Sequence, residues 1–316
     1  MFPVSHRPGR PGPRTAVAVA ALSLFAAGFL VVPEPMAART QQAPAAGAPA
    51  GTPAVEGQAP AARRGGRGRR GGDPFAGQPR VRALVISGGC CHDYPTQDQV
   101  VVDTLSRVLP VDWTVVYEGG TDRIGHQPTY ANPDWAKGFD IVVHNECFGM
   151  NTDESLLRRI VEPHRNGIPA VVVHCSMHSY RTAANADVWR EFVGVTSTRH
   201  TNAHRIAVKV TPGVDPLLTG WGADWTTPTD ELYVIEKVWP GARPLATAVS
   251  PEAGRAEYPV IWLNNYQGTR VFVTTLGHGP SWNDPVFQDL LVRGFHWALG
   301  RTPGAPGGPS AVPAQP

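Results

Sequence analysis

The chain has 316 residues and a formal net charge of +2, from 28 lysines and arginines against 26 aspartates and glutamates. Residues 1–80 contain ten arginines and three acidic residues, so the rest of the chain carries a net charge of −5. A mildly acidic domain without a basic stripe argues against nucleic acid as a partner. With only four cysteines, the chain also falls outside the class of small domains that depend on disulfides.

The first 38 residues have the layout of a secretory signal peptide. A basic start precedes an uncharged apolar run at 16–32, and small residues follow at Ala37 and Ala38. The run of 17 residues is at the short end of the range for a membrane-spanning helix, so an uncleaved N-terminal anchor is the alternative. We therefore expect an exported protein, periplasmic or secreted, that meets a membrane only through such an anchor.

Three segments are expected to follow the signal peptide. Residues 39–79 are rich in Ala, Pro, Gly and Arg and predict a disordered linker, because they cannot bury enough apolar surface to offset their ordering entropy. Its arginine–glycine core at 63–72 indicates a solvated basic tether. A single folded domain is expected at 80–302, followed by a disordered tail at 303–316.

The first half of the domain alternates predicted strands with predicted helices. Apolar runs indicate strands at 81–86, 111–117, 139–144 and 168–174, with helices at 96–109, 154–165 and 187–192 between or after them. Asn151 and Glu154 resemble a capping box that opens the second helix. Continuously apolar strands separated by helices predict an α/β fold of the flavodoxin-like, three-layer α/β/α type with a mainly parallel sheet.

The second half of the domain changes pattern. Segments 205–210 and 232–238 alternate apolar and polar residues, and 259–264 with 269–275 predict a hairpin around Gln267-Gly268. These segments are expected to be antiparallel edge strands added to the sheet. An amphipathic helix at 284–299, stopped by Gly300, closes the domain.

Polar clusters follow three of the predicted parallel strands. In open parallel sheets, ligands bind beyond the carboxyl ends of the strands, where the strand order reverses. The clusters should therefore face one crevice, which we interpret as a functional pocket. They are Cys90-Cys91-His92-Asp93-Tyr94, His144-Asn145-Glu146-Cys147 and His174-Cys175-Ser176-Met177-His178-Ser179-Tyr180-Arg181.

Three chemistries could use this crevice. The first is acid–base catalysis by a carboxylate (Glu146 or Asp93) with a histidine (His92 or His178). The second is a divalent metal such as zinc, since His, Asp, Glu and Cys are suitable ligands, although no CxxC pair is present and the signal is diffuse.

The third is a nucleophilic Cys175, which lacks the flanking glycines of a tight nucleophile turn. Inert buried thiols are expected instead at Cys90, Cys147 and Cys175. Adjacent Cys90 and Cys91 are not expected to bridge each other.

Taken together, these motifs resemble the ThuA-like (trehalose utilisation) family. The resemblance covers about residues 80–301, and its most specific parts are DELY (230–233) and TTLGH (274–278). It implies a class I glutamine amidotransferase-like fold. It also implies that Glu231 of DELY, His278 of LGH, Trp282, and His200 or His204 join the crevice. The other matching segments are SGGCCHDY, FDIVVHNECF, IPAVVVHCSMHSYR, YPVIW and RVFVTTLGHGPSW.

The resemblance also guides the functional hypothesis. Where amidotransferases keep a glycine-flanked nucleophilic cysteine, this chain has His174-Cys175-Ser176, so glutamine hydrolysis does not carry over. The family is associated with the use of sugars, including oxidised keto-sugars, which implies a carbohydrate substrate. Aromatic rings at Trp135, Trp282, Tyr94 and Tyr180 could then stack on sugar faces.

Our hypothesis is an exported enzyme, a hydrolase or isomerase acting on a carbohydrate or keto-sugar derivative, small or oligomeric. The alternative is a non-catalytic sugar-binding module. A divalent metal is left open as a cofactor, without assigned ligands. The expected catalytic residues are His92, Glu146, His178 and Glu231. The expected substrate-binding residues are Asp93, Tyr94, Asn145, His174, Cys175, Tyr180, Arg181, His278 and Trp282.

Overall fold

A computed structural model describes residues 74–252 and 254–301. The expected signal peptide, the linker up to residue 73 and the tail therefore lie outside the described residues. Within the described ranges, no helix combines the length and the apolar character needed to cross a membrane.

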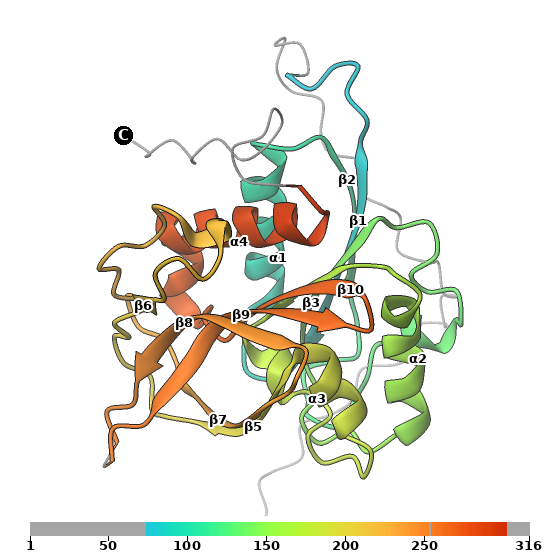
Figure 1. The fold of residues 1–316 in the computed structure, drawn as a ribbon. Coiled ribbons are helices and arrows are strands. Elements are labelled where there is room, and N and C mark those ends of the chain that lie inside the picture. The colour runs from blue at the N-terminus through green and yellow to red at the C-terminus, as the bar shows by residue number, and fades with distance from the viewer. Residues whose placement is uncertain (1–73, 253, 302–316) are drawn as a thin grey trace, which may run out of the picture. The chain divides into compact units, whose positions relative to one another are not determined.

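The described segment alternates strands and helices along its first half and is strand-rich in its second half (Figure 1). The helices are α1 (Tyr94–Ser106), α2 (Glu154–Arg165), α3 (Asp187–Val193) and α4 (Pro285–Ala298), with 3-10 turns η1 (Pro128–Ala131), η2 (His174–His178), η3 (Pro216–Leu218) and η4 (Gly279–Asn283). The strands are β1 (Val81–Gly89), β2 (Val111–Tyr117), β3 (Ile141–Cys147), β4 (Ala170–Val173), β5 (Val195–His200), β6 (Lys209–Val210), β7 (Tyr233–Val238), β8 (Ala242–Val249), β9 (Glu257–Tyr266) and β10 (Thr269–Thr274).

The main sheet has eight strands in the order β2-β1-β3-β4-β10-β9-β8-β6. The first five pair in parallel, in the arrangement of flavodoxin-like sheets, and β9, β8 and β6 continue it antiparallel. The predicted fold class is thus confirmed. One detail differs: segment 269–275 was expected at an antiparallel edge, but β10 pairs in parallel with β4 and so lies inside the sheet.

Helices cover both faces of this sheet (Figure 1), and the residues of β1 show how the two cores are built. Val81, Ala83 and Val85 pack in the core beneath α1 and α4, whereas Leu84 and Ile86 pack in the core beneath α2 and α3. Successive side chains of a strand point to opposite faces, so a strand buried on both sides must be apolar throughout. This is why the parallel strands appear as continuous apolar runs in the sequence.

Several local features depart from the sequence-based expectation. Strands β5 and β8 were not predicted, and β5 pairs with β7 in a separate two-stranded sheet. Segment 205–210 contributes only the short β6. The N-cap of α2 is Asp153, whose carboxylate accepts hydrogen bonds from the backbone of Ser155 and Leu156, rather than the expected Asn151.

Close packing of α4 on β10 depends on Gly294. A Cβ at this position would overlap the ring of Phe272, which is fully buried in β10. We expect Gly294→Ala to lower the free energy of unfolding by about 1–3 kcal/mol, because the overpacked core must shift. Urea denaturation measures this loss. Arg158→Ala, on the exposed face of α2, serves as the control and should change stability by less than about 0.5 kcal/mol. If Gly294→Ala has the wild-type free energy of unfolding, the core around Phe272 can accommodate the added methyl group without cost.

A chain of buried polar side chains lies in the core on the α2 side of β3. Tyr130 donates a hydrogen bond to Glu146 Oε1 at 2.8 Å, and His144 Nδ1 lies 3.1 Å from the same oxygen. His144 Nε2 lies 3.0 Å from His164 Nε2, and His164 Nδ1 lies 2.7 Å from the carbonyl of Ile168. All these side chains except Ile168 are fully buried. The chain satisfies polar groups that would otherwise be costly inside the core.

Buried His164, in this row of polar side chains, makes the free energy of unfolding depend on pH. Burial, together with neighbouring His144, lowers the pKa of His164 to about 3 from its usual 6.5. As the pH falls below 6.5 the unfolded chain takes up a proton that the folded chain refuses. We therefore expect this histidine to remove up to about 1.4 kcal/mol of stability per pH unit until pH 3 is approached. Urea denaturation between pH 7 and pH 4 should show a shallower slope for His164→Gln than for wild type. The variant His126→Gln, at an exposed position, should keep the wild-type slope. Equal slopes for all three proteins would show that His164 does not cause the pH dependence.

Candidate functional site

A pocket of ≈ 240 Å³ lies at the carboxyl ends of β1, β3 and β4. These strands are neighbours in the order β1-β3-β4, so the loops that follow them meet at one edge of the sheet. Residues from the β5–β7 region and from the segment after β10 complete the wall. The lining residues are Cys90, Cys91, His92, Arg123, Cys147, Gly149, Cys175, His178, Arg181, His200, Glu231 and His278.

The chain bends sharply where it enters this pocket. Cys91, just after β1, has φ 87°, and His174, just after β4, has φ 47°. Residues other than glycine rarely adopt such left-handed backbone conformations, and they cluster at functional sites when they do. The bends bring His92 and His174 close together, with ring centroids 4.8 Å apart.

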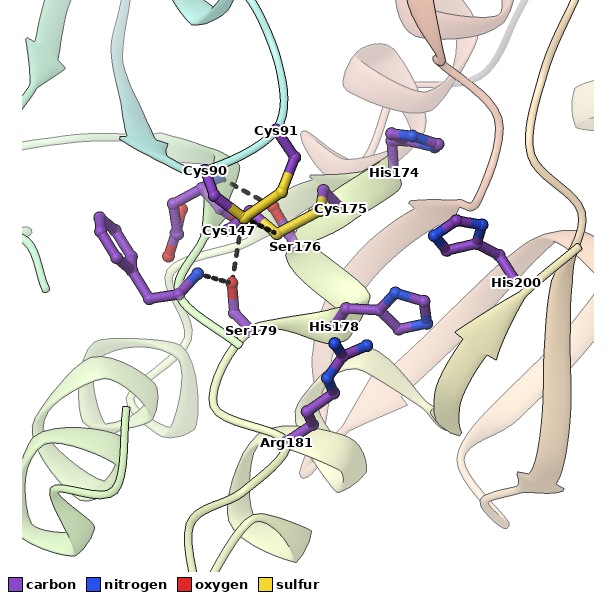
Figure 2. Close-up of a disulfide and its surroundings, with 12 residues drawn as sticks. Cys90, Cys91, Cys147, His174, Cys175, Ser176, His178, Ser179, Arg181 and His200 are labelled. Carbon is purple, nitrogen blue, oxygen red and sulfur yellow. Dashed lines mark hydrogen bonds between the residues drawn. A yellow bond between two sulfur atoms is a disulfide. The ribbon is translucent and has the colours of Figure 1, made fainter. Parts of the chain in front are cut away.

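The η2 turn is tied to β3 by two serine hydroxyls (Figure 2). Ser176 Oγ donates to the carbonyl of His144 and accepts from the backbone N–H of Glu146, each at 3.0 Å. Ser179 Oγ donates to the carbonyl of Glu146 at 2.8 Å and accepts from the N–H of Phe148 at 3.1 Å. These bonds use the backbone groups that β3 leaves unpaired at its end, and they fix the turn that carries the pocket histidines.

Glu231 is the central carboxylate of the pocket. Its Oε2 lies 3.5 Å from His174 Nε2 and 3.6 Å from His200 Nε2, and its Oε1 lies 3.5 Å from His278 Nδ1. The Glu231 side chain is 15% exposed, so it faces the pocket from a largely enclosed position. One ring nitrogen each from His92, His174 and His278 lie within 4.8 Å of one another, a set that could hold a metal ion.

Burial and mutual contact shift the pKa values of Glu231, His92 and His174. Burial alone would raise the pKa of Glu231, but the adjacent His174, together with His200 and His278, lowers it to about 2. Burial lowers the pKa of His92 to about 3, with His174 and His278 adding to the effect. Burial would also lower the pKa of His174, but Glu231 and Asp230 raise it above its usual value. At neutral pH the site therefore combines an anionic carboxylate with a neutral His92.

Asp230 holds the two motif segments together from beneath the pocket. It is fully buried, and its carboxylate accepts hydrogen bonds from the backbone N–H groups of Glu231 (2.8 Å), Gly277 (3.0 Å) and His278 (3.2 Å). The Ser281 hydroxyl donates a fourth bond at 2.8 Å. Asp230 thus positions Glu231 and His278 without lining the pocket itself.

A second wall of the pocket carries His178, Arg181 and His200 (Figure 2). His178 stacks on Tyr233 with centroids 4.0 Å apart, and its Nε2 lies 2.9 Å from Ser197 Oγ. Burial lowers the pKa of His178 well below its usual value, and Arg181 adds to this effect. Arg181 is oriented by a 2.8 Å hydrogen bond from its guanidinium to the carbonyl of Thr198. The wall therefore offers a cation and a neutral imidazole to a ligand.

The four cysteines form two disulfides at the floor of the pocket (Figure 2). Cys90 pairs with Cys91, and Cys147 pairs with Cys175; Cys90 Sγ lies 3.8 Å from Cys147 Sγ. The expectation of inert thiols, and of no bridge between adjacent cysteines, was wrong. The clusters after β1, β3 and β4 meet at the strand ends, which brings all four sulfurs together. Bonded to Cys147, Cys175 offers no thiolate for nucleophilic attack.

The two disulfides should contribute very differently to stability. Cys147 and Cys175 are 28 residues apart, whereas the bond between the adjacent Cys90 and Cys91 encloses no intervening residues. Chain-entropy arguments give about 3–4 kcal/mol for the longer loop. We expect the paired substitution Cys147→Ala/Cys175→Ala to lower the free energy of unfolding by that amount. Cys90→Ala/Cys91→Ala, as the matched control, should cost much less. Equal losses in urea denaturation would contradict this account.

Many of the residues expected at the site do meet at the pocket. His92, His178, Glu231, Cys175, Arg181 and His278 line it, and His174 contacts Glu231 from the adjoining wall. Of the two histidines left open, His200 reaches the pocket. His204 lies elsewhere, with its Nδ1 2.8 Å from the carbonyl of Asn202.

Other expected residues lie outside the pocket. Glu146 and Asn145 sit on β3, a strand buried on both faces: Glu146 joins the buried chain with Tyr130, and Asn145 bonds Gln97 of α1. Strand residues before the last one point into the two cores rather than beyond the strand end. Asp93 caps α1 by accepting from Thr96.

The aromatic residues expected to stack on sugars are likewise core residues, so this part of the expectation was wrong. Tyr94, Tyr180 and Trp282 are buried, and Trp135 packs beside Tyr130. Tyr94 donates to the carbonyl of Cys90, and Trp282 donates to the carbonyl of Gly277, so their polar atoms face the protein. Large aromatics fill cores in this way when their polar atom finds a partner.

Sequence reasoning missed two contributors to the site. Asp230 belongs to the DELY segment but was not singled out, because no local pattern showed that its carboxylate accepts the backbone N–H groups of Glu231, Gly277 and His278. Arg123, in the loop after β2, carried no local pattern and reaches the pocket only through the fold.

Comparison with known proteins bears on this arrangement. The family model described as ThuA, trehalose utilisation, matches residues 84–298. The chain belongs to the ThuA family. A ThuA-like protein from Parabacteroides merdae superposes with a TM-score of 0.55 at 20% identity, over 74% of this chain and 96% of that one. A ThuA-like protein from Bacteroides uniformis superposes with a TM-score of 0.53 at 16% identity, over 72% of this chain and 95% of that one. These likenesses show the shared ThuA-like fold, and no curated protein matches the sequence.

Proposed function

We propose that this ThuA-family protein is an exported enzyme, a hydrolase or isomerase that acts on a carbohydrate or keto-sugar derivative in the pocket around Glu231. The observation that carries the proposal is the carboxylate of Glu231, set within 3.5–3.6 Å of ring nitrogens from His174, His200 and His278. A carboxylate among imidazoles is the composition that proton transfer to and from a substrate requires.

The chemistry of the pocket suits a polyhydroxylated ligand. Arg123 and Arg181 offer guanidinium donors to hydroxyl or carbonyl oxygens, and Glu231 offers an acceptor. Glu231 can take a proton from a hydroxyl, or from a carbon next to a keto group, while a protonated imidazole at His278 would deliver one to the oxygen on the other side. The substrate class itself comes from the family, which is described by trehalose utilisation.

Export is supported by the cysteines. Both disulfides of the described domain would be hard to keep in a reducing cytoplasm, whereas they persist in a periplasm or outside the cell. This agrees with the signal-like segment at residues 1–38, which lies outside the described residues.

The alternative of a non-catalytic sugar-binding module has less support. Such modules present exposed aromatic rings to stack on sugar faces, but the pocket of this domain is lined by histidine, arginine, glutamate and cystine. The four aromatic residues considered for stacking are buried. The described pocket therefore resembles a reaction site more than a binding platform.

A turnover screen separates the two functions. The full chain would be incubated with trehalose, other disaccharides and their mono-keto derivatives, and products would be followed by mass spectrometry and NMR. We expect at least one carbohydrate to be converted, at a rate proportional to the amount of protein. Saturable binding by calorimetry, without any product, would overturn the enzyme proposal in favour of the binding module.

A further inference from the structure

We propose that His92, His174, His278 and Glu231 form a binding site for one divalent transition-metal ion of the zinc type. The three histidines come from different elements: His92 follows β1, His174 follows β4, and His278 follows β10. One nitrogen from each lies within 4.8 Å of the other two. Tetrahedral zinc, with bonds of roughly 2.0–2.1 Å to imidazole nitrogen, holds its ligand atoms roughly 3.3 Å apart, so small side-chain rotations close the set around an ion.

Glu231 supplies the fourth ligand. Its two oxygens already reach His174 Nε2 and His278 Nδ1, each at 3.5 Å. These distances are too long for good hydrogen bonds but close to the spacing of neighbouring ligands around one ion. Three imidazoles and a carboxylate make up a donor set typical of zinc and similar ions.

An unpartnered nitrogen inside the site points to a cation. The Nδ1 of His174 lies 2.6 Å from the carbonyl of Thr275, so Nδ1 carries a proton and donates it there. Its Nε2 then directs a lone pair at the Glu231 carboxylate, and this buried atom has no hydrogen-bond partner among the described residues. The buried Nδ1 of His278, 3.5 Å from Glu231 Oε1, likewise has no hydrogen-bond partner among the described residues. A positive charge shared by these acceptors, either a proton or a metal ion, would satisfy them, and a metal ion serves several at once.

Outer hydrogen bonds hold the proposed ligands in place, as they commonly do around bound metal ions. The Nδ1–carbonyl bond of His174 fixes its ring orientation, as outer partners of ligating histidines commonly do. Asp230 holds the backbone of both Glu231 and His278, which sets their spacing. A water or a substrate oxygen could reach such an ion from the side that faces the ≈ 240 Å³ pocket, as a fifth ligand.

The donor set also indicates which ions are excluded. Imidazole-rich sites prefer zinc and similar transition ions, whereas Mg²⁺ and Ca²⁺ favour sites built of oxygen ligands. The nearby sulfurs of Cys90, Cys91 and Cys147 form a second close group, but in the disulfide state they are not thiolate ligands. The catalytic use of such an ion, to polarise a carbonyl or activate a water, rests on the proposed function, whereas its binding does not.

The test is a metal titration of the untagged full chain under non-reducing conditions. Protein stripped with a chelator would be titrated with Zn²⁺ and, separately, with Mg²⁺ by calorimetry, and bound metal would be counted by elemental mass spectrometry. We expect one equivalent of Zn²⁺, a higher Tm with Zn²⁺, and no comparable binding of Mg²⁺. His92→Ala and Glu231→Gln should each weaken Zn²⁺ binding by at least about 100-fold, more than the loss of an outer partner usually does.

Matched variants locate the ion. His204→Ala, at a histidine outside the pocket, should keep one equivalent of Zn²⁺ with wild-type affinity. Cys90→Ala/Cys91→Ala should still bind one equivalent of Zn²⁺, because the sulfurs are not ligands. The proposal is overturned if no Zn²⁺ binds, if Mg²⁺ binds as tightly, or if the cysteine variant loses the ion while His92→Ala keeps it. Both ligand variants alter partly exposed or pocket-facing side chains, and circular dichroism checks that they fold. A chain that binds Zn²⁺ but converts no carbohydrate would refute the proposed function alone.

Discussion

Replacing Glu231 by glutamine is expected to lower kcat/KM by about 10²- to 10⁴-fold for whichever carbohydrate the wild-type protein converts. The substitution keeps the size of the side chain but removes both the negative charge and the proton acceptor. Three histidine nitrogens within 3.5–3.6 Å would then face a neutral amide. Because Glu231 faces the pocket rather than the core, its loss should act on the reaction far more than on folding.

The control for this variant is Glu191→Gln, on an exposed position of α3. It removes the same charge from the same chain and should leave kcat/KM within twofold of wild type. Rates of product formation and melting temperatures would be measured for all three proteins. If Glu231→Gln keeps wild-type kcat/KM, the pocket carboxylate has no catalytic role and the proposed function loses its main support.

Asp230→Asn is expected to affect both stability and activity. The carboxylate accepts four hydrogen bonds in a fully buried position, including those from the backbone of Glu231, Gly277 and His278. An amide NH₂ placed against N–H donors leaves buried groups unpaired, which should cost about 3 kcal/mol. Displacement of Glu231 and His278 should further lower kcat/KM by about 10- to 100-fold, as losses of outer partners do at metal sites.

Asp153→Asn is the matched control. Asp153 also accepts two backbone hydrogen bonds, but at the N-cap of α2, where asparagine is as good a cap as aspartate. Its free energy of unfolding and its kcat/KM should stay near wild type. Urea denaturation together with kinetics at a temperature where every variant is folded separates the two effects. A destabilised Asp230→Asn variant with wild-type kcat/KM would show that Asp230 supports the fold without positioning the site.

Much of the fold follows from the sequence for one physical reason. Strands β1, β3 and β4 are buried by helices on both faces, so they are apolar throughout and bounded by turn residues. Strand β5, with the sequence VTSTRH, carries no such run, because three of its six residues are exposed and it pairs only with β7. Polar edge strands of this kind owe their pairing to the surrounding fold.

The candidate site was predictable in its location but only partly in its members. The rule that ligands bind beyond the ends of parallel strands identified the loops that carry His92, His174 and His178. The rule did not distinguish a residue within the end of a strand from one beyond it. Glu146 was therefore expected in the pocket, but the pleat of β3 directs its side chain into the core. Glu231 precedes β7, outside the parallel strands, and His278 follows β10, which was expected at an antiparallel edge, so only the family resemblance indicated them.

The disulfides could not be predicted because spacing along the chain does not reveal pairing in space. Cys147 ends β3 and Cys175 lies in η2 just after the neighbouring parallel strand β4, and this brings their Cα atoms to 5.4 Å. The link between Cys90 and Cys91 depends on a left-handed backbone at Cys91, which sequence propensity would not have favoured.

The most direct test of the central claim is a crystal structure of the full-length Glu231→Gln variant soaked with the carbohydrate that the wild type converts. We predict that the sugar occupies the ≈ 240 Å³ pocket, with oxygen atoms within hydrogen-bonding distance of position 231 and of Arg181. Density for the sugar at another hollow, such as the one beside Trp221 and Trp225 or the one beside Arg243 and Arg270, with the Glu231 pocket left free of it, would contradict the account.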